Sequence, residues 1–287
     1  MNNNLVVGID IGGSHITAAL VDLNAHTIIS NSLIRQHVNS KGNAEQIIKE
    51  WTTAIANCKA FDSSASKKIG IAMPGPFDYK KGISLIKGLD KFDALYNLNV
   101  KELLANELEI DSSDIFIMND ASCFLRGEVF CGAARHCENV IGITLGTGLG
   151  SATYRAGVVY DGDLYYSPFK AATAEDYLST RWFLMRYEEL TGITAKNVKE
   201  IVERIPEDSR VKLVFAEFGG NLGEVLVTYL KRHKAETVVI GGNIINAWNL
   251  FINETGRALA DFSLKVSIVK AKLGEEAALM GAASLCV

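Results

Sequence analysis

Two glycine-rich turns are places where the backbone itself could bind a ligand. The first is Gly12-Gly13, followed by Ser14, and the second runs from Gly146 to Gly150 and includes Thr147 and Gly148. Residues without a Cβ let backbone N–H groups approach phosphate oxygens, and positive φ is free to them. Either turn alone could be a tight hairpin and nothing more. Together they favour a polyphosphate ligand.

A carboxylate, Asp10, stands just before the first of these turns. Phosphoryl transfer needs a divalent ion to neutralise developing charge, and a carboxylate can hold Mg²⁺ through water or orient the phosphates. An aspartate can also simply cap its own turn. With two glycine turns in the same chain, we expect Asp10 to position Mg²⁺.

The glycine turns do not match two common nucleotide motifs. No glycine begins the G-x-x-x-x-G-K-[S/T] string of a P-loop, and Ser151 stands where a Rossmann fingerprint needs glycine or alanine. The residues after Gly150 alternate like a strand instead of opening a helix. A dehydrogenase is therefore disfavoured.

The elements around the two turns repeat. Strand-like segments Leu5 to Ile11 and Ile16 to Asp22 flank the first turn, and a third strand is expected around Thr27 to Ile34. Val140 to Leu145 and Ser151 to Val159 flank the second turn in the same way. This pattern predicts an internal duplication of a β-meander-plus-helix unit.

Helical periodicity follows each meander. Apolar residues recur at helical spacing from Asn43 to Cys58, before a buried strand at Lys68 to Met73. The later expected elements are helical segments over Asp176–Arg204 and Ser209–His233, a strand at Ala235–Ile240 and a closing helix over Glu275–Leu285. Because no Pro- or Ser-rich linker separates the halves, we expect a packed hinge near residue 118. The expected domains are 1–118 with the closing helix 275–287, and 119–274.

Composition excludes several classes of protein. The 287 residues carry a net charge of -4, which offers no basic surface for nucleic acid. No apolar run approaches the ~18 residues that span a bilayer, and the polar start Met1–Asn4 lacks signal-peptide architecture, so a cytoplasmic location is expected. The five cysteines lack C-x-x-C spacing, which argues against a disulfide framework or a structural zinc site.

In their order and spacing, five motifs of the chain resemble the ROK family of sugar kinases. They are Gly8-Ile9-Asp10-Ile11-Gly12-Gly13-Ser14, Pro74-Gly75-Pro76, Asn119-Asp120, Gly146-Thr147-Gly148-Leu149-Gly150 and Ile240-Gly241-Gly242. Both glycine turns are shared with the wider actin/hexokinase-like superfamily, whereas the full ordered set is specific and covers nearly the whole chain. The resemblance implies an α/β, two-domain actin-like/ribonuclease H-like ATPase fold with a substrate cleft between the domains.

The resemblance also implies roles for single residues. ATP phosphates would lie at the two glycine turns and adenosine near Gly241-Gly242. Asp120 would be the catalytic base, because a hydroxyl that attacks a γ-phosphoryl group needs a carboxylate to orient it and accept its proton. Asn119 and Gly75 would contact the sugar. Without the other motifs, Asn119-Asp120 could be only the polar end of a strand over Ile115 to Met118.

Two departures from the family pattern concern the acceptor half. The usual Glu-x-Gly-His and cysteine-rich zinc motifs are absent, since no His lies between His136 and His233 and no Cys between Cys137 and Cys286. Zinc is therefore not expected. Glu175 would correspond to the family glutamate that contacts the sugar, or it could stabilise a helix N-terminus.

The second departure is at position 88. The chain has Gly88-Leu89 where the family usually has Asn-Leu, and the family asparagine contacts the sugar. Each missing hydrogen bond to a sugar hydroxyl costs on the order of 1 kcal/mol. The acceptor could therefore be another hexose, an N-acetylated sugar or something smaller than glucose.

Three alternatives remain open at this level. Inorganic polyphosphate could replace ATP as donor, although Lys87, Lys91 and Lys101 are too scattered to indicate a binding strip and suggest solvated surface charge. A sugar-sensing repressor would place a helix-turn-helix domain ahead of the first glycine motif, which here lies within the first dozen residues. A binding-only pseudokinase is disfavoured by the retained aspartates and glycine turns. The family further suggests a homodimer, and His15 could touch phosphate or face solvent.

Overall fold

The computed structural model of the chain describes residues 4–206 and 208–287. The chain forms two compact units, the first comprising the chain up to Arg135 together with Glu275–Val287 and the second His136–Gly274. The polar residues 1–3 lie outside the described part of the chain. Among the described residues, no helix combines the length and apolar character needed to cross a membrane.

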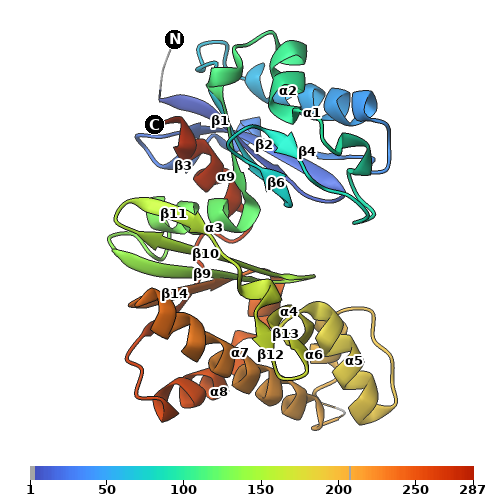
Figure 1. Cartoon of the computed structure of the whole chain (residues 1–287), viewed down its shortest axis with the longest axis vertical. Coiled ribbons are helices and arrows are strands. Elements are labelled where there is room, and N and C mark those ends of the chain that lie inside the picture. Colours follow the sequence, from blue (N-terminus) through green and yellow to red (C-terminus); the bar gives the residue numbers. More distant parts are fainter. Residues whose placement is uncertain (1–3, 207) are drawn as a thin grey trace. The chain divides into compact units, whose positions relative to one another are not determined.

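The first unit is built on one mixed sheet (Figure 1). Its strands are β1 (Leu5–Ile11), β2 (His15–Asp22), β3 (Thr27–Ile28), β4 (Ile34–His37), β5 (Ile69–Met73) and β8 (Ile115–Asn119). The order is β3-β2-β1-β5-β8, and β4 also pairs with β2. Strand β1 is antiparallel to β2 and parallel to β5, which is parallel to β8. A small hairpin of β6 (Phe77–Asp78) and β7 (Ile83–Ser84) follows β5.

Four helices complete the first unit: α1 (Ala44–Lys59), α2 (Val100–Leu108), α3 (Asp120–Phe130) and α9 (Glu276–Ala283). Helix α1 begins at a capping box, in which the Asn43 side chain and Gln46 bond reciprocally. Glycines allow α9 to lie directly on its neighbours. A Cβ at Gly70 of β5 would be 1.8 Å from the Ala282 carbonyl oxygen, and one at Gly127 of α3 would be 2.1 Å from that of Ala277.

The second unit repeats the sheet topology of the first. Its strands are β9 (Asn139–Leu145), β10 (Leu149–Arg155), β11 (Val158–Asp161), β14 (Thr237–Gly241) and β15 (Ser267–Lys270), in the order β11-β10-β9-β14-β15. Strand β9 is antiparallel to β10 and parallel to β14, which is parallel to β15. The predicted internal duplication was of a β-meander-plus-helix unit, and the matching strand orders of the two sheets confirm its β-meander.

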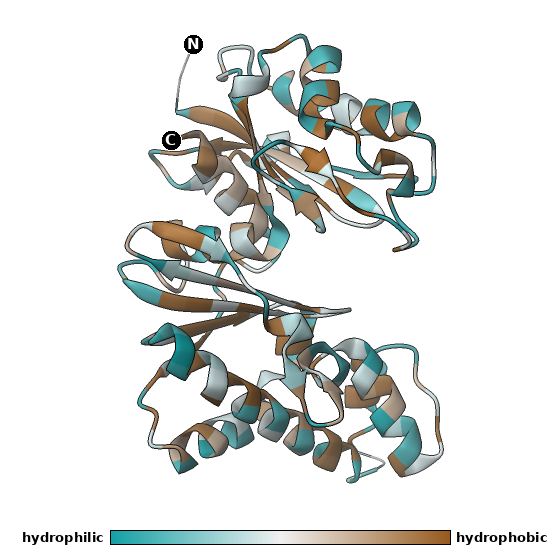
Figure 2. Ribbon diagram, in the orientation of Figure 1, coloured by the Kyte–Doolittle hydropathy of each residue, from teal (hydrophilic) through white to brown (hydrophobic). Residues whose placement is uncertain are grey.

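Helices α4 (Ala174–Tyr177), α5 (Thr180–Thr191), α6 (Val198–Glu203), α7 (Val211–His233) and α8 (Trp248–Asp261) belong to this unit, as does a hairpin of β12 (Pro168–Phe169) and β13 (Ala172–Thr173). Figure 2 shows teal and brown alternating along these helices, as expected of helices with one buried face. Phe183, Phe215, Phe218 and Phe251 are fully buried and pack ring against ring in the core.

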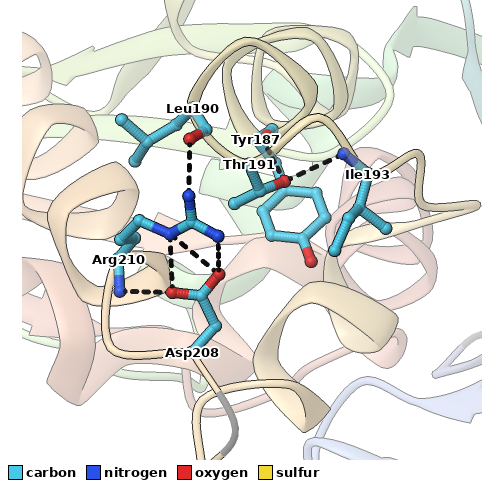
Figure 3. Close-up of polar contacts among 6 residues, drawn as sticks. All are labelled: Tyr187, Leu190, Thr191, Ile193, Asp208 and Arg210. Atoms are coloured by element: carbon cyan, nitrogen blue, oxygen red, sulfur yellow. Dashed lines mark hydrogen bonds and ion pairs between the residues drawn. The ribbon is translucent and has the colours of Figure 1, made fainter.

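Arg210 fixes the start of α7 against the end of α5 (Figure 3). Its guanidinium donates to both carboxylate oxygens of Asp208 at 2.7–3.0 Å and to the Leu190 carbonyl oxygen at 3.2 Å. In the same view Thr191 donates to the Tyr187 carbonyl oxygen and accepts from the Ile193 N–H. The bond from Arg210 to Leu190 satisfies a carbonyl group that the end of α5 leaves free.

Several expected elements are interrupted in the structure. The strand expected over Thr27 to Ile34 is broken by the 3-10 turn Ser30–Ser32. The strand expected over Ser151 to Val159 is a hairpin, because Ala156 and Gly157 turn the chain at φ 50° and 83°. The helical segment from Asp176 to Arg204 contains parts of three helices, and Gly192 ends α5 at φ 74°.

The units also divide farther along the chain than the expected hinge near residue 118. They divide between residues 135 and 136, so α3 falls in the first unit. The physical reason is its tight packing on α9, where a Cβ at Gly281 would lie 1.8 Å from the Cys123 carbonyl oxygen.

Candidate active site

Four of the predicted site residues lie at one edge of the first sheet. In the register, Asp10 pairs with Ala72, and Met73 at the end of β5 pairs with Asn119 at the end of β8. Because β1, β5 and β8 are parallel, their carboxyl ends meet at the same edge, where ligands of open α/β sheets commonly bind. Gly75 follows β5 at this edge, and Asp120 follows β8.

Asp120 is the first residue of α3 and is accessible to solvent. Its pKa is raised above the usual range, chiefly because surrounding protein displaces water from the carboxylate. The 2.8 Å hydrogen bond from the Ala121 N–H and the charge of Lys91 act in the opposite direction. A carboxylate with a raised pKa is a better proton acceptor, which suits a general base.

Asp10 lies near the end of β1 and is partly buried. Desolvation and the charge of Asp120 raise its pKa to about 6, a change that Arg35 opposes and Glu275 reinforces. Arg35 and Glu275 themselves form an exposed ion pair at 3.1 Å. A desolvated carboxylate whose ionisation a second aspartate disfavours suits a site for a divalent cation, which would stabilise the negative charge.

We predict a pH-dependent stability effect from Asp10. Between the unfolded pKa of 3.8 and the folded value of about 6, the native state keeps a proton that the unfolded chain releases. The free energy of unfolding therefore falls as pH rises through this window, by at most about 3 kcal/mol. Urea unfolding without Mg²⁺ should show Asp10→Asn to be more stable than the parent at pH 8 and equal to it at pH 4. A stability difference that does not change with pH would contradict this cause.

Asn119 is largely occupied by structural bonds. Its Oδ1 accepts from the N–H groups of Ala121 and Ser122 at 2.8 and 3.1 Å and so caps α3. Its Nδ2 donates to the Tyr79 hydroxyl at 3.1 Å, and Tyr79 donates to the Met73 carbonyl oxygen. Asn119 thus fixes the helix that begins with the proposed base, and its side chain also hydrogen-bonds to the Asp120 carboxylate, which lowers the pKa of Asp120.

Tyr79 was missed by the sequence analysis. Besides binding Asn119, its hydroxyl would lie 3.1 Å from a Cβ at Gly75, so the Tyr79 ring and the Gly75 backbone are adjacent. A glycine at position 75 leaves room for this hydroxyl. No sequence pattern indicated Tyr79, because it is brought to Asn119 only by the fold of the chain after β5.

The first glycine turn closes the hairpin of β1 and β2, with the Gly12 N–H donating to the His15 carbonyl oxygen at 2.8 Å. Gly12, Gly13 and Ser14 are all exposed. Neither glycine has a left-handed φ, and a Cβ at either would meet other atoms only at 3.5 Å. The positive φ that glycine would permit is therefore not used here. The fold would tolerate alanine at both positions, and the bare backbone is left accessible to a ligand.

Lys91 lies beside this turn and was wrongly grouped with scattered surface charge. Its Cδ would be 3.5 Å from a Cβ at Gly13, and its charge lowers the pKa of Asp120. Lys91 is partly buried, whereas Lys87 is exposed and its ammonium lies over the Tyr96 ring. Lys91 places a cation near both the first turn and the proposed base. No periodic pattern marks Lys91, because residues 87–99 form a largely irregular segment.

The His15 side chain makes contacts within the protein. Its Nδ1 is 2.9 Å from the Ser14 hydroxyl, and its ring packs edge-on against His37. The Ser14 side chain is therefore held next to the turn by His15.

The second glycine turn is braced from within its own unit. The Gly146 N–H donates to the Gly148 carbonyl oxygen at 3.0 Å, and the Leu149 N–H donates to Oε2 of Glu175 at 3.0 Å. Thr180 donates through both its N–H and its hydroxyl to the Gly146 carbonyl oxygen, at 2.8 and 2.9 Å. Thr147 remains exposed. Glu175 and Thr180 thus hold the second glycine turn directly.

Local sterics also favour glycine at position 148, since a Cβ there would lie 2.6 Å from Oε2 of Glu175. Gly241 and Gly242 lie at the same edge of the sheet, because Gly241 pairs with Thr144 just before the turn. Gly242 has φ 85°, and a Cβ there would be 2.3 Å from the Leu145 carbonyl oxygen. Gly242 is therefore required by the fold itself.

Gly88 has room for a side chain. It has φ 70°, its N–H donates to Asp93 at 2.7 Å, and a Cβ would meet nothing within 4 Å. Sterics alone do not exclude the family asparagine. Among the described residues, no cluster of three or more His, Cys, Asp or Glu side chains could hold a metal. The expectation that no zinc binds stays a prediction.

The chain is similar to known proteins over nearly its whole length. The ROK family model matches residues 6–166 and 168–287. The N-acetyl-D-glucosamine kinase of Mannheimia succiniciproducens is 26% identical over 98% of this chain and 99% of its own length. The glucokinase of Thermotoga maritima is 24% identical over 98% and 96%.

A solved ROK family glucokinase from Streptomyces griseus, in complex with glucose and AMPPNP, superposes with a TM-score of 0.77 at 22% identity and covers 98% of both chains. This likeness confirms the actin-like α/β fold class. The resemblance to sugar kinases is confirmed by the family match over nearly the whole chain.

Proposed function

Because the chain belongs to the ROK family, we propose that it transfers the γ-phosphoryl group of ATP to a hydroxyl of a hexose or hexose derivative. The observation that carries the proposal is the pair Asp10 and Asp120 at one sheet edge, both with raised pKa values, beside a glycine turn that leaves its backbone bare. Kinase activity on sugars is common to the related N-acetyl-D-glucosamine kinase and glucokinase.

In the proposed reaction, the sugar hydroxyl oxygen attacks the γ-phosphorus and its proton passes to the Asp120 carboxylate. The new O–P bond forms as the bond to ADP breaks. Gly12, Gly13 and Ser14 bind phosphate oxygens in the first unit. Thr147 and Gly148 do so in the second, and Gly241 with Gly242 lie near adenosine.

Mg²⁺ bound near Asp10 would neutralise charge on the phosphates. Asp10 fits this ion because desolvation and the charge of Asp120 raise its pKa, and a bound cation would stabilise the ionised carboxylate. Asp10 holds the ion directly or through water, and Asp120 reinforces the negative potential that attracts it.

The proposed acceptor contacts are Gly75, Asn119 and Glu175. Asn119 bonds to the Tyr79 hydroxyl and to the proposed base, which keeps it beside the acceptor hydroxyl. Oε1 of Glu175 is 4.0 Å from Arg181 while Oε2 holds the second turn. A sugar bound to Glu175 would therefore be linked through this side chain to the turn that binds phosphate. With Gly88 in place of asparagine, the acceptor class extends to N-acetylated hexoses and smaller sugars.

A coupled assay of the purified chain tests the function. Mg-ATP and then polyphosphate would be offered with glucose, mannose, N-acetylglucosamine and N-acetylmannosamine, and ADP or the sugar phosphate measured. Turnover with one sugar and ATP would support the proposal. Turnover with polyphosphate alone would replace the donor, and silence with all sugars, together with saturable sugar binding, would indicate a non-catalytic sugar-binding protein.

We predict that Gly13→Ala separates folding from catalysis. The free energy of unfolding should stay within about 1 kcal/mol of the parent, because a Cβ at Gly13 clashes with nothing. The kcat/KM for ATP should fall about ten- to hundredfold, because the methyl group obstructs hydrogen bonds from the turn to phosphate. Gly220→Ala in α7, where a Cβ is equally free, is the matched control and should leave the kinetics unchanged. Equal kinetics for both variants would remove the first turn from the phosphate site.

We also predict that Lys91→Met lowers kcat about tenfold and moves the acidic limb of the pH–rate profile to higher pH. The reason is that Lys91 stabilises the ionised form of Asp120 and places a cation beside Gly13. Lys87→Met, whose ammonium lies over the Tyr96 ring, is the matched control. Steady-state kinetics from pH 5 to 9 would check this, and superimposable profiles for the two variants would contradict it.

A homodimer and a cytoplasmic location complete the proposal and rest on the family resemblance. Size-exclusion chromatography with light scattering over a range of protein concentrations tests the assembly.

A further inference from the structure

The Tyr79 hydroxyl joins segments that meet at the carboxyl edge of the first sheet. Tyr79 is the first residue after β6, and its hydroxyl donates to the Met73 carbonyl oxygen at 3.1 Å. It also accepts from Nδ2 of Asn119 at 3.1 Å. Met73 and Asn119 are paired in register at the ends of β5 and β8. The hydroxyl therefore bridges the two strand ends that Gly75 and Asp120 follow.

The orientation of the Asn119 amide group is determined by its partners. Oδ1 accepts from the N–H groups of Ala121 and Ser122. Rotation of the amide by about 180° would turn the Nδ2 hydrogens towards these two donors, so Nδ2 must face Tyr79. The Asn119 side chain also hydrogen-bonds to the Asp120 carboxylate. Asn119 thus connects the Tyr79 hydroxyl to the proposed base.

Tyr79 is itself held by the hairpin of β6 and β7. Its ring centroid lies 5.2 Å from that of the buried Phe77. The turn that follows Tyr79 is closed by a 2.8 Å bond from the Gly82 N–H to the Asp78 carbonyl oxygen, and Gly82 has φ 76°. These contacts limit the movement of the Tyr79 ring, so its hydroxyl is a fixed point for Asn119.

We propose that Tyr79 is a positioning residue of the acceptor site: its hydroxyl holds the Asn119 amide, and through it the Asp120 carboxylate, in the orientation that receives the acceptor hydroxyl. This inference rests on the proposed function, in which Asp120 is the base. Proton transfer requires donor and acceptor atoms about 2.6–3.2 Å apart, and a misplacement of about 1 Å can cost on the order of 10²-fold in rate. Loss of the hydroxyl that orients Asn119 should therefore affect the rate.

Tyr79→Phe removes the hydroxyl and keeps the ring. With the acceptor that the sugar assay identifies, kcat should fall about tenfold and the KM for sugar should rise about fivefold, because the proposed base and the acceptor contact Asn119 both lose their orientation. The KM for ATP should stay within about twofold of the parent. A mere loss of folded protein would lower kcat alone and leave both KM values unchanged, so the two KM values distinguish positioning from a structural role.

Tyr96→Phe is the matched control. Tyr96 lies in the same unit and is 39% exposed, and its ring centroid lies 4.8 Å from Nζ of Lys87, a contact that phenylalanine retains. Its kinetics should equal those of the parent. Equal kinetics for Tyr79→Phe and Tyr96→Phe would overturn the inference.

A double-mutant cycle tests whether Tyr79 acts through Asn119. Asn119→Ser keeps an oxygen that can cap α3 but removes Nδ2, the atom that bonds to Tyr79. Adding Tyr79→Phe to Asn119→Ser should then change kcat and the KM for sugar less than about twofold. Undiminished effects of Tyr79→Phe in that background would show that Tyr79 acts by another route, and the inference would be wrong.

A readout without turnover separates this inference from the proposed function. The side-chain amide resonances of Asn119 in the ¹H–¹⁵N spectrum can be assigned with Asn119→Ser. They should shift in Tyr79→Phe and stay unchanged in Tyr96→Phe, because the Tyr79 hydroxyl accepts from Nδ2. Inactivity of the parent on every sugar would contradict the proposed function alone, whereas Asn119 resonances that do not differ between Tyr79→Phe and the parent would contradict the inference.

Discussion

Asp120→Asn should lower kcat for sugar phosphorylation about 10³-fold while leaving ATP binding and folding nearly intact. Asparagine matches the shape of the carboxylate but cannot accept the hydroxyl proton, and general-base catalysis of this kind typically contributes 10²–10⁴-fold. Stability should not fall, because the ionised Asp120 is disfavoured by desolvation in the native state. Asn119 continues to cap α3 through its own side chain.

The measurement is single-turnover and steady-state kinetics with the acceptor that the sugar assay identifies, together with calorimetric binding of a non-hydrolysable ATP analogue. Glu102→Gln is the matched control, since Glu102 lies in the first turn of α2 in the same unit and its loss removes one carboxylate from a helix N-terminus. It should keep the parent kcat. If Asp120→Asn retained more than about a tenth of the activity, Asp120 would not be the base.

The second large effect is on folding: Gly281→Ala should destabilise the first unit by about 3 kcal/mol or more. A Cβ at this position of α9 would lie 1.8 Å from the Cys123 carbonyl oxygen and 2.8 Å from the Gly127 nitrogen, both backbone atoms of α3. The two helices must separate to admit it. Since α3 begins with Asp120, activity should fall together with stability.

Urea unfolding monitored by circular dichroism measures this cost. Gly256→Ala in α8 is the control, because a Cβ there meets nothing within 4 Å and alanine favours a helix by roughly 0.5–1 kcal/mol over glycine. It should be as stable as the parent or more so. Equal stability of Gly281→Ala and Gly256→Ala would show that the α3–α9 contact is looser than the structure indicates.

The sequence located elements better where a strong local signal marked their ends. Strand β1 was predicted with its observed ends, Leu5 and Ile11, because a mainly apolar, β-branched run stops at a glycine turn. The helix expected from Asn43 was found as α1, where Asn43 forms the cap. By contrast, the Ala156-Gly157 turn was missed because the apolar pattern on either side continues through it.

The roles of individual glycines could not be told apart from sequence. Gly12 and Gly13 look like Gly70 and Gly281 in a string of letters, yet only the last two lie against backbone of another element. That difference depends on how close α9 comes to the sheet and to α3. Hence only the folded chain distinguishes a glycine that lets a ligand approach the backbone from a glycine that lets a neighbouring helix pack closely.

By itself the sequence determined the fold class, the duplicated meander and the resemblance to sugar kinases, because these depend on local periodicity and on motifs in a fixed order. Only the tertiary structure brought Lys91 to the first turn, Tyr79 to Asn119, and Glu175 with Thr180 to the second turn. The tertiary structure also raised the pKa of Asp10, through desolvation and the charge of an aspartate 110 positions later in the chain. Contacts between residues so far apart in sequence leave no periodic signal, since they are fixed by parallel strands that end at a common edge.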